Sequence, residues 1–389
     1  MANDRIWYAV QQVGMKALNG DSYTAAHGVQ SFGMTTNFNL DQVFELGQQE
    51  IYENIEEIPD VEITMSKVLD GYPLLYHLAT KGAATTAPTL AGRQNTKTFV
   101  AAAIFPDTNT SCDGVADSIV ECSGMRIGSV GYNFPVDGNF SEDVTLVGND
   151  KIWKGDSNIL HTATQTRRNA ISFDGAFGSE DSPLAPNVGV NRRQDLIFGA
   201  GNGEADTNGS LDDPDVTVLP QEVYGITSSG TNEKTNDVYG AHVSNISVSV
   251  DFGREQINEL GRRAPYHRFV NFPVEVTTEI EVVSSSGDMV SATEDGILTV
   301  GAGGCLDAGN LSHRTIRIAV CEGTRIYLGR KNKLSSVNYG GGDAGGGSVS
   351  VSYTYTTYSD FTVMHSGDPH ANGSTWWANR ETNTYLVED

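Results

Sequence analysis

The sequence predicts a mainly β protein made of two tandem antiparallel modules. We expect each module to be a β-sandwich or barrel-like unit with short helices and long hairpins, and an inserted connector to join the two. Composition, strand-like alternation and an internal repeat predict this class. The chain has 389 residues, which suits two domains. It holds 43 Gly and is rich in Thr, Ser, Asn and Val, a mixture typical of short strands joined by tight turns.

The internal repeat is the most informative of the three observations. Residues 38–47 (FNLDQVFELG) and 252–261 (FGREQINELG) are identical at five of ten positions, with an offset of 261 − 47 = 214. After one gap, Val61 aligns with Val274; further on, residues 129–132 (SVGY) match 336–339 (SVNY) at an offset of 207, which also places Val144 on Val351. Matches that keep their order indicate a duplicated unit.

The repeat divides the chain into four parts. Residues 151–215 have no partner in the repeat and include a polar, Gly-rich run at 199–209, which is typical of a connector. Within them we expect order only near 152–153 and 196–198. The predicted parts are a first module at 1–150, a connector or insertion at 151–215, a second module at 216–365 and a C-terminal arm at 366–389.

Alternation of apolar and polar residues predicts the strands of each module. In the second module, Ile246, Val248 and Val250 share one face, and residues 274–283 alternate throughout; residues 29–38 and 61–65 are the counterparts in the first. Long hairpins are predicted at 127–147, around the Asp137-Gly138 turn, and at 333–358, around a Gly-rich tip. Apolar residues spaced i, i+3, i+4 from Leu40, with Gly47 as a stop, predict a short helix or turn.

The charge argues against direct binding of nucleic acid. The chain has 49 acidic and 25 basic residues and a formal net charge of −24, so it lacks the basic footprints that neutralise phosphates. An acidic surface either guides DNA by repelling it or only keeps the protein soluble. Three carboxylates gather on one strand face, at Glu275, Glu279 and Glu281.

The sequence gives no reason to expect an enzyme or a cofactor. It contains no nucleophile elbow, no zinc-protease pair and no phosphate-binding loop. A partial calcium-loop pattern at 204–215 lacks the usual first and last ligands, and His365, Asp368 and His370 are explained by a polar tail, so no metal site is predicted. Among the four cysteines there is no Cys-x-x-Cys pair; Cys112 and Cys122 are either bridged or reduced.

Targeting features are also missing from the sequence. It has no run of 18 apolar residues, so nothing is expected to span a membrane. Its first residues lack the basic-then-apolar pattern of a signal peptide, so synthesis and folding in a cytoplasm are expected.

The segment ending in Glu45-Leu46-Gly47 and its copy, the strands after Pro59 and Pro273, and the two long hairpins resemble the tail tube proteins of long-tailed bacteriophages. The resemblance is one of layout and extends over about two thirds of the chain. It implies a structural virion protein in the phage tail, assembled in the host cytoplasm. Three two-module chains would form a pseudo-sixfold ring, and stacked rings would form a hollow tube through which DNA passes without specific binding.

The resemblance further implies the chain itself as the main partner, with tail sheath, tape measure and baseplate or terminator proteins as others. It supplies no catalytic residue. We predict a net acidic lumen lined by acids drawn from Glu142, Asp143, Glu275, Glu279, Glu281 and Asp343.

Three other interpretations remain open at this point. The first is a trimeric hub protein at the tube tip, which shares the doubled module. The second is a tail-associated protein that binds or degrades glycans, for which Trp376-Trp377 is the one hint of an aromatic platform and which a docking arm explains better. The third is a cellular injection or secretion tube.

Overall fold

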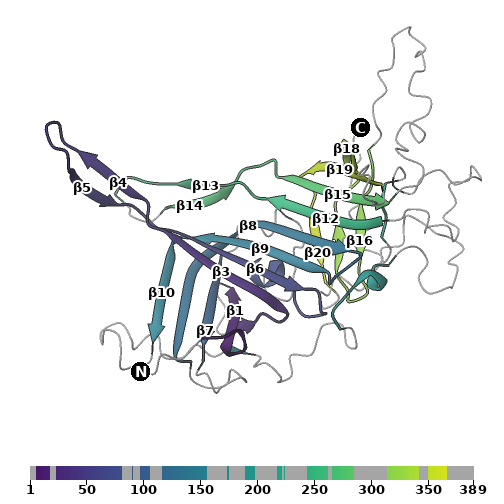
Figure 1. The fold of residues 1–389 in the computed structure, drawn as a ribbon, viewed down its shortest axis with the longest axis horizontal. Coiled ribbons are helices and arrows are strands. Elements are labelled where there is room, and N and C mark those ends of the chain that lie inside the picture. Colours follow the sequence, from purple (N-terminus) through teal and green to yellow (C-terminus); the bar gives the residue numbers. More distant parts are fainter. Residues whose placement is uncertain are drawn as a thin grey trace, which may run out of the picture.

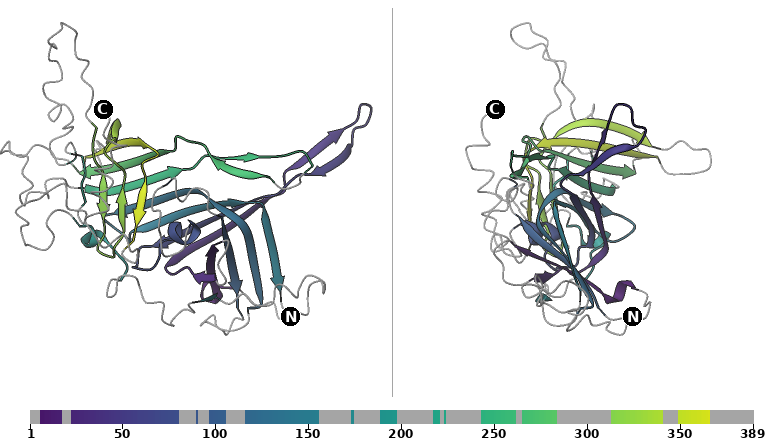
Figure 2. Two further views of the ribbon diagram at one scale, coloured as in Figure 1. Left: turned by 180° about the vertical axis from the view of Figure 1, so that it is seen from behind. Right: turned by 90° about the vertical axis from the view of Figure 1, so that its left-hand side faces the viewer.

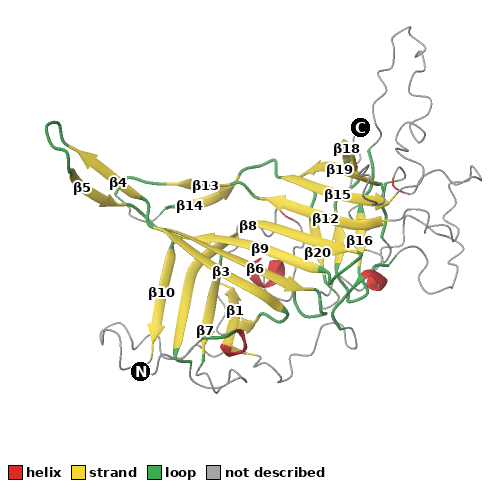
Figure 3. Ribbon diagram, viewed as in Figure 1, coloured by secondary structure: helices red, strands yellow, loops and turns green. Residues whose placement is uncertain are grey.

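The computed structural model describes residues 6–17, 23–80, 90, 97–105, 116–155, 173–174, 189–197, 217–220, 223, 243–261, 265–283, 313–340 and 349–365. These residues form a mainly β protein, as the alternation predicts (Figure 1, Figure 3). The Gly-rich tip of the second hairpin, the calcium-loop pattern, His370, Trp376 and Trp377 lie outside them.

One antiparallel sheet of eight strands runs through both halves of the chain. In spatial order its strands are β3 (Val29–Asn37), β6 (Asp60–Val68), β9 (Ser141–Gly148), β8 (Ser118–Pro135), β12 (Val243–Asp251), β15 (Glu275–Val283), β19 (Ser350–Tyr358) and β18 (Lys333–Gly340). The predicted strands and both long hairpins are therefore confirmed, and Gly138 takes the positive φ of 134° that its turn requires.

The two halves of this sheet have the same strand order. The first half runs β3-β6-β9-β8 and the second runs β12-β15-β19-β18, so each strand has a counterpart at the same place in its own half. The halves meet where β8, the last strand of the first half, pairs with β12, the first strand of the second.

Irregularities in strand pairing recur at equivalent positions. The β3–β6 ladder shifts register at Gln30 and the β12–β15 ladder shifts at Ser244, an offset of 244 − 30 = 214. The β8–β9 ladder shifts at Gly128 and the β18–β19 ladder at Ser335, an offset of 335 − 128 = 207. A β-bulge re-aims a strand and is a specific feature of a fold. Its recurrence at the offsets found in the sequence favours duplication of one unit.

The register corrects part of the sequence alignment. Val144 pairs with Met65 and Val130, whereas Tyr353 pairs with Ile280 and Val337. Val144 therefore corresponds to Tyr353 and not to Val351. The alignment of Val61 with Val274 is likewise shifted by two residues. Such a shift is invisible to an alternation pattern, because residues two apart on a strand lie on the same face.

The start of the predicted connector also belongs to the repeat. Strand β10 (Asp150–Gly155) pairs with the first part of β8, as β20 (Thr362–Met364) pairs with β17 (Arg325–Tyr327). The two ladders are equivalent, because Trp153 lies opposite Val120 and Thr362 lies opposite Tyr327, at the offsets of 209 and 207 that the other ladders give. The expectation that residues 151–215 have no partner in the repeat is therefore wrong for this strand. The order expected near residue 196 is present, as Leu196 bridges Val320.

Each half carries a hairpin arm between its first two sheet strands. These arms are β4 (Leu40–Phe44) with β5 (Ile51–Glu56), and β13 (Arg254–Ile257) with β14 (His267–Val270), and both extend beyond the sheet on the same side (Figure 1, Figure 2). Of the short helix or turn predicted from Leu40, the helix is wrong, because Leu40–Phe44 is a strand, whereas a turn is present at Leu46 and Gly47. The apolar residues there lie on both faces of a projecting, exposed hairpin. Because neither face is buried, their spacing is not restricted to every second residue and matches a helical pattern. The tips end in fully exposed Leu46 and Leu260, each followed by a Gly at positive φ.

A second layer covers the apolar face of the sheet. In the first half it comprises the short helix α1 (Leu75–Thr80) together with β1 (Gln11–Ala17), β2 (Tyr23–Ala25) and β7 (Thr98–Ile104). In the second half it comprises β16 (Arg317–Ala319), β17 and β20. Buried residues of both halves belong to one hydrophobic cluster, with Ile63, Ile246, Ile280 and Ile318 among its members. The two halves therefore share a core.

A shared core predicts cooperative unfolding. Replacing Ile246 by Ala, at the junction strand β12, should reduce the free energy of unfolding by about 2–5 kcal/mol, because Ile246 is fully buried. Urea titration followed by circular dichroism should show one transition for both halves. The neighbouring change Ser247→Ala, on the opposite face, should alter stability by no more than about 0.5 kcal/mol. Two separate transitions in the wild type would contradict the shared core.

Candidate functional site

The opposite face of the eight-stranded sheet is polar along its whole width. The strands direct Ser, Thr and Asn side chains to this face, as at Ser249, which lies beside Gly131 on one side and Thr277 on the other. The pattern continues to β19 and β18, where Thr354 lies opposite Ser336. We call this surface the polar face. It exists because each strand alternates between a buried apolar residue and a small polar one.

Carboxylates are spread over the polar face. They come from four neighbouring or near-neighbouring strands and are exposed or half-buried: Glu62, Asp143, Asp251, Glu275, Glu279 and Glu281. Glu279 accepts a hydrogen bond of 2.6 Å from the Ser352 hydroxyl. On the described strands of this face, the basic residues are Lys333, which lies across from Thr356, and buried Arg126, which lies across from Val147. The polar face therefore has a net negative charge.

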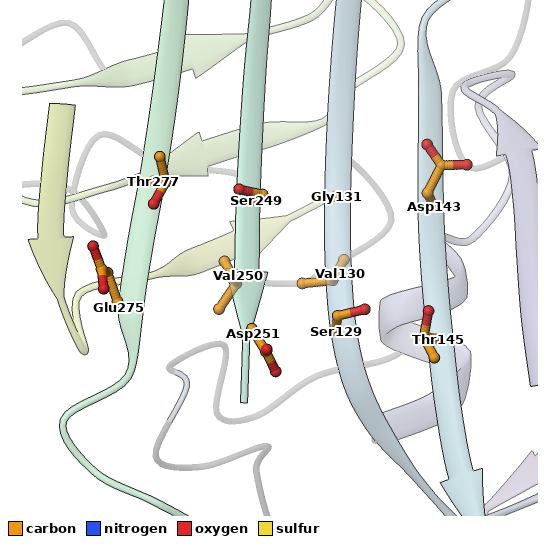
Figure 4. A pocket seen from close by; sticks show the side chains of 10 residues that line it. All are labelled: Ser129, Val130, Gly131, Asp143, Thr145, Ser249, Val250, Asp251, Glu275 and Thr277. Carbon is orange, nitrogen blue, oxygen red and sulfur yellow. The ribbon is translucent and has the colours of Figure 1, made fainter. Parts of the chain in front are cut away.

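A shallow groove marks the middle of the polar face, at the junction of the two halves. Figure 4 shows Asp143 on one side of Gly131 and Ser249, Asp251 and Glu275 on the other. Gly131 has no side chain, so its backbone lines the groove directly. Within the described residues, no group of three His, Cys, Asp or Glu side chains is placed to hold a metal ion.

Glu142 does not lie on this face. Asp143 and Glu142 are adjacent on β9, so their side chains point to opposite faces, and Glu142 is fully buried. Its carboxyl accepts hydrogen bonds from the backbone N–H groups of Leu75 (2.6 Å) and Tyr76 (3.0 Å) and from the Tyr132 hydroxyl (2.9 Å). Burial raises the pKa of Glu142, and these three donors oppose that rise. The residue anchors helix α1 to the sheet and is corrected from a lumen candidate to a structural group.

The other predicted acids divide into two groups. Asp143, Glu275, Glu279 and Glu281 lie on the polar face, and Asp343 lies outside the described residues. Glu62 and Asp251 also lie on the polar face and were missed in the sequence. Alternation could have found both, because Glu62 lies between buried Val61 and Ile63, and Asp251 continues the Ser247–Ser249 face.

Arginines fasten the second arm to the first half of the chain. Arg268 forms an ion pair of 2.5 Å with Asp60 and donates to Asn149 at 3.2 Å. Arg254 donates to the backbone carbonyl of Ile127, and Arg126 donates to that of Arg268 at 3.0 Å. Burial, with the nearby charges of Arg126 and Arg268, lowers the pKa of Arg254 to about 9. The junction is thus held by side chains as well as by the β8–β12 ladder.

Cys122 and Cys321 are free thiols, so a bridge between Cys112 and Cys122 is absent. Burial raises the pKa of Cys122 to about 11, which keeps it protonated and unreactive. His365 is buried against Glu322, with 2.5 Å between Nε2 and Oε2, and is not part of a polar tail. No helix in the described part of the chain is long and apolar enough to cross a membrane.

Comparison with known proteins gives similarity in structure only. No protein-family model and no curated protein matches the chain. Among solved structures, a sheath–tube complex of an extracellular contractile injection system (PVC, extended state) is 11% identical, with a TM-score of 0.29 over 40% of this chain and 94% of that one. The tube-terminating cap of the anti-feeding prophage is 13% identical, with a TM-score of 0.30 over 40% and 94%. A chain from the virion of a gene transfer agent is 13% identical, with a TM-score of 0.25 over 38% and 96%. At these scores the similarity does not define the function of the chain.

The position of Glu142 gives a prediction about stability. Glu142→Gln replaces one acceptor oxygen by an amide N–H group that faces a donor, so the free energy of unfolding should fall by about 1–3 kcal/mol. Chemical denaturation measures this change. The matched variant Asp143→Asn, one residue away on the polar face, should change stability by less than about 0.5 kcal/mol. Equal effects of the two variants would contradict the different placement of these neighbours.

Proposed function

We propose that the chain is a structural protein of a phage tail or a related injection apparatus, and that it assembles into closed rings that stack into a hollow tube. The observation that carries this proposal is the open sheet made of two equivalent halves. Its ends are β3 and β18, and the internal contact between β8 and β12 already joins one half to the next. Repeating that contact between chains closes a ring and leaves no strand edge exposed.

The layers of the chain support the polar face as the lumen. Helix α1 and the smaller sheets cover the apolar face, so the described residues outside the eight-stranded sheet that form a second layer lie on that side. A ring closed around the other side has the polar face as its inner wall. Serine, threonine and carboxylate side chains then meet the water of the channel.

An acidic inner wall suits the passage of DNA. Carboxylates such as Glu275 and Glu279 repel phosphates, whereas basic groups at many positions would hold the strand in place. At about 0.15 M salt the repulsion extends roughly 8 Å from the wall. DNA passes without specific binding, no cofactor takes part and the role is not catalytic. In such an apparatus the partners would be further copies of the chain, sheath, tape measure and baseplate or terminator proteins, and the location would be the virion.

The number of chains in a ring is a direct test. Two modules in each chain give six quasi-equivalent positions when three chains close one ring, so electron micrographs of the purified protein should show threefold rings that stack. A ring of six chains, with twelve modules, would contradict this arrangement.

Reversing charge on the inner wall should make it retain DNA. Tubes assembled from the Glu275→Lys, Glu279→Lys variant should bind a short DNA duplex with an affinity that falls steeply with salt, whereas wild-type tubes should not bind. Fluorescence anisotropy measures this binding. The control variant Glu45→Lys, Glu53→Lys carries the same charge change on the first arm, away from the polar face. Equal binding by the two variants would place the effect outside the lumen.

A hub at the tip of the tube is the second candidate, because the two arms of this chain differ chemically. The root of the second arm is held by arginines, whereas the first arm lacks them and exposes apolar side chains such as Phe44 and Ile51. A hub would meet different partners above and below, so the purified chain would stop at single rings. Growth into long tubes would exclude the hub.

A further inference from the structure

We propose that β18 of one chain pairs with β3 of the next in a defined register, in which Asn338 lies opposite Thr35 and Tyr339 lies opposite Met34. This pairing rests on the proposed ring and specifies the contact that closes it. The partner is a second copy of this chain. The template is the junction that the chain already contains between its two halves.

The internal junction supplies the geometry. Strand β12 pairs antiparallel with β8 from Asn245 to Asp251, with Ser249 opposite Gly131 and Val248 opposite Tyr132. The counterparts of β12 and β8 are β3 and β18, which are the two ends of the eight-stranded sheet. These ends are the first and the eighth strands of an antiparallel sheet, so they run in opposite directions. A copy placed beside β18 therefore presents its β3 antiparallel, as β12 stands beside β8.

Matching bulges fix the register. The bulge at Ser244 in β12 matches Gln30 in β3, and the bulge at Gly128 in β8 matches Ser335 in β18, which gives offsets of 214 and 207. Ser249 then corresponds to residue 249 − 214 = 35, and Gly131 to residue 131 + 207 = 338. The same arithmetic places Asn37 opposite Ser336. The four side chains belong to the polar face, so this face remains continuous across the contact; they are Thr35, Asn37, Ser336 and Asn338.

The ends of β3 and β12 have the same local structure but differ in burial. The Asn37 side chain accepts a hydrogen bond from the N–H of Asn39, and the Asp251 side chain accepts one from the N–H of Gly253. Asn39 and Gly253 both have positive φ. Between these groups lie Phe38 and Phe252. Phe252 is 1% exposed, whereas Phe38 is 59% exposed.

This difference in burial has a cause at the junction. Phe252 donates its N–H to the carbonyl of Gly128 at 2.9 Å, so it lies against β8 of the first half. Phe38 has no preceding half beside it within its own chain. The partner strand shows the same contrast, because Tyr132 is 1% exposed and its counterpart Tyr339 is 55% exposed. Both ends of the sheet thus expose a large aromatic side chain at the position where the internal junction buries one.

Cysteine pairs test the register. Thr35→Cys with Asn338→Cys, and Asn37→Cys with Ser336→Cys, place thiols on directly opposed residues of neighbouring chains, about 4.5–5.5 Å apart between Cβ atoms. Mild oxidation of assembled rings should link these pairs into dimers and closed trimers on a non-reducing gel. The crossed pairs Thr35→Cys with Ser336→Cys, and Asn37→Cys with Asn338→Cys, use the same positions as diagonal neighbours about 7–8 Å apart. They should link at least fivefold more slowly.

The outcomes separate the pairing from the ring itself. Rings in which the crossed pairs link as fast as the opposed pairs would overturn the register. Rings in which no pair links would overturn the contact between β18 and β3 and leave the ring intact as a proposal. If no ring forms from the wild type, the proposed function fails, and this contact fails with it. Single-cysteine variants control for linkage through Cys321, which is exposed.

A substitution at Phe38 tests the contact without labels. Phe38→Ser should reduce the assembly of protein rings at least tenfold, because the Phe38 side chain is expected to be buried only between chains. The circular dichroism spectrum and melting of the unassembled chain should be unchanged, since Phe38 is exposed there. The control Tyr8→Ser removes another exposed aromatic side chain, outside β3, and should assemble like the wild type. Normal assembly of Phe38→Ser would overturn the proposal.

Discussion

The pairing of β8 with β12 is the interaction on which the rest of the structure depends. It joins two four-stranded halves into one sheet, so that apolar residues of both halves share a core on one side and polar residues form a continuous face on the other. Arginines at the root of the second arm reinforce it. A separate four-stranded half would expose unpaired backbone groups at both edges, and the junction satisfies those of β8 and β12 within the chain.

Much of the sheet could be predicted because alternation is a local property. Strands such as β12 and β15 appear in the sequence almost as they fold, and so does the turn at Gly138. Strand order and the junction could not be predicted, since they depend on which edges meet in space. The strands of the first arm were not predicted, and a short helix or turn was expected there, because an isolated hairpin has no buried face to impose a period of two.

The candidate site was predictable in part for the same reason. Glu275, Glu279 and Glu281 alternate with buried residues, and the structure places all three on the polar face. Glu142 was assigned wrongly because a carboxylate at a buried position is unusual in a sequence. It is tolerated here by donors from Leu75, Tyr76 and Tyr132, and the first two are more than sixty positions away in the chain.

The unlike arms have a consequence for how rings could be stacked. In a ring of identical single modules, a turn by one module would bring every arm onto an equivalent neighbour. Here a turn by one module exchanges an arm rooted by Arg254 and Arg268 with one whose corresponding residues are Leu40 and Asn54. One ring could therefore lie on the next in two different orientations, which are related by a rotation of one module. A stack of such rings would carry a threefold signature along its length, even where the sheet itself looks sixfold.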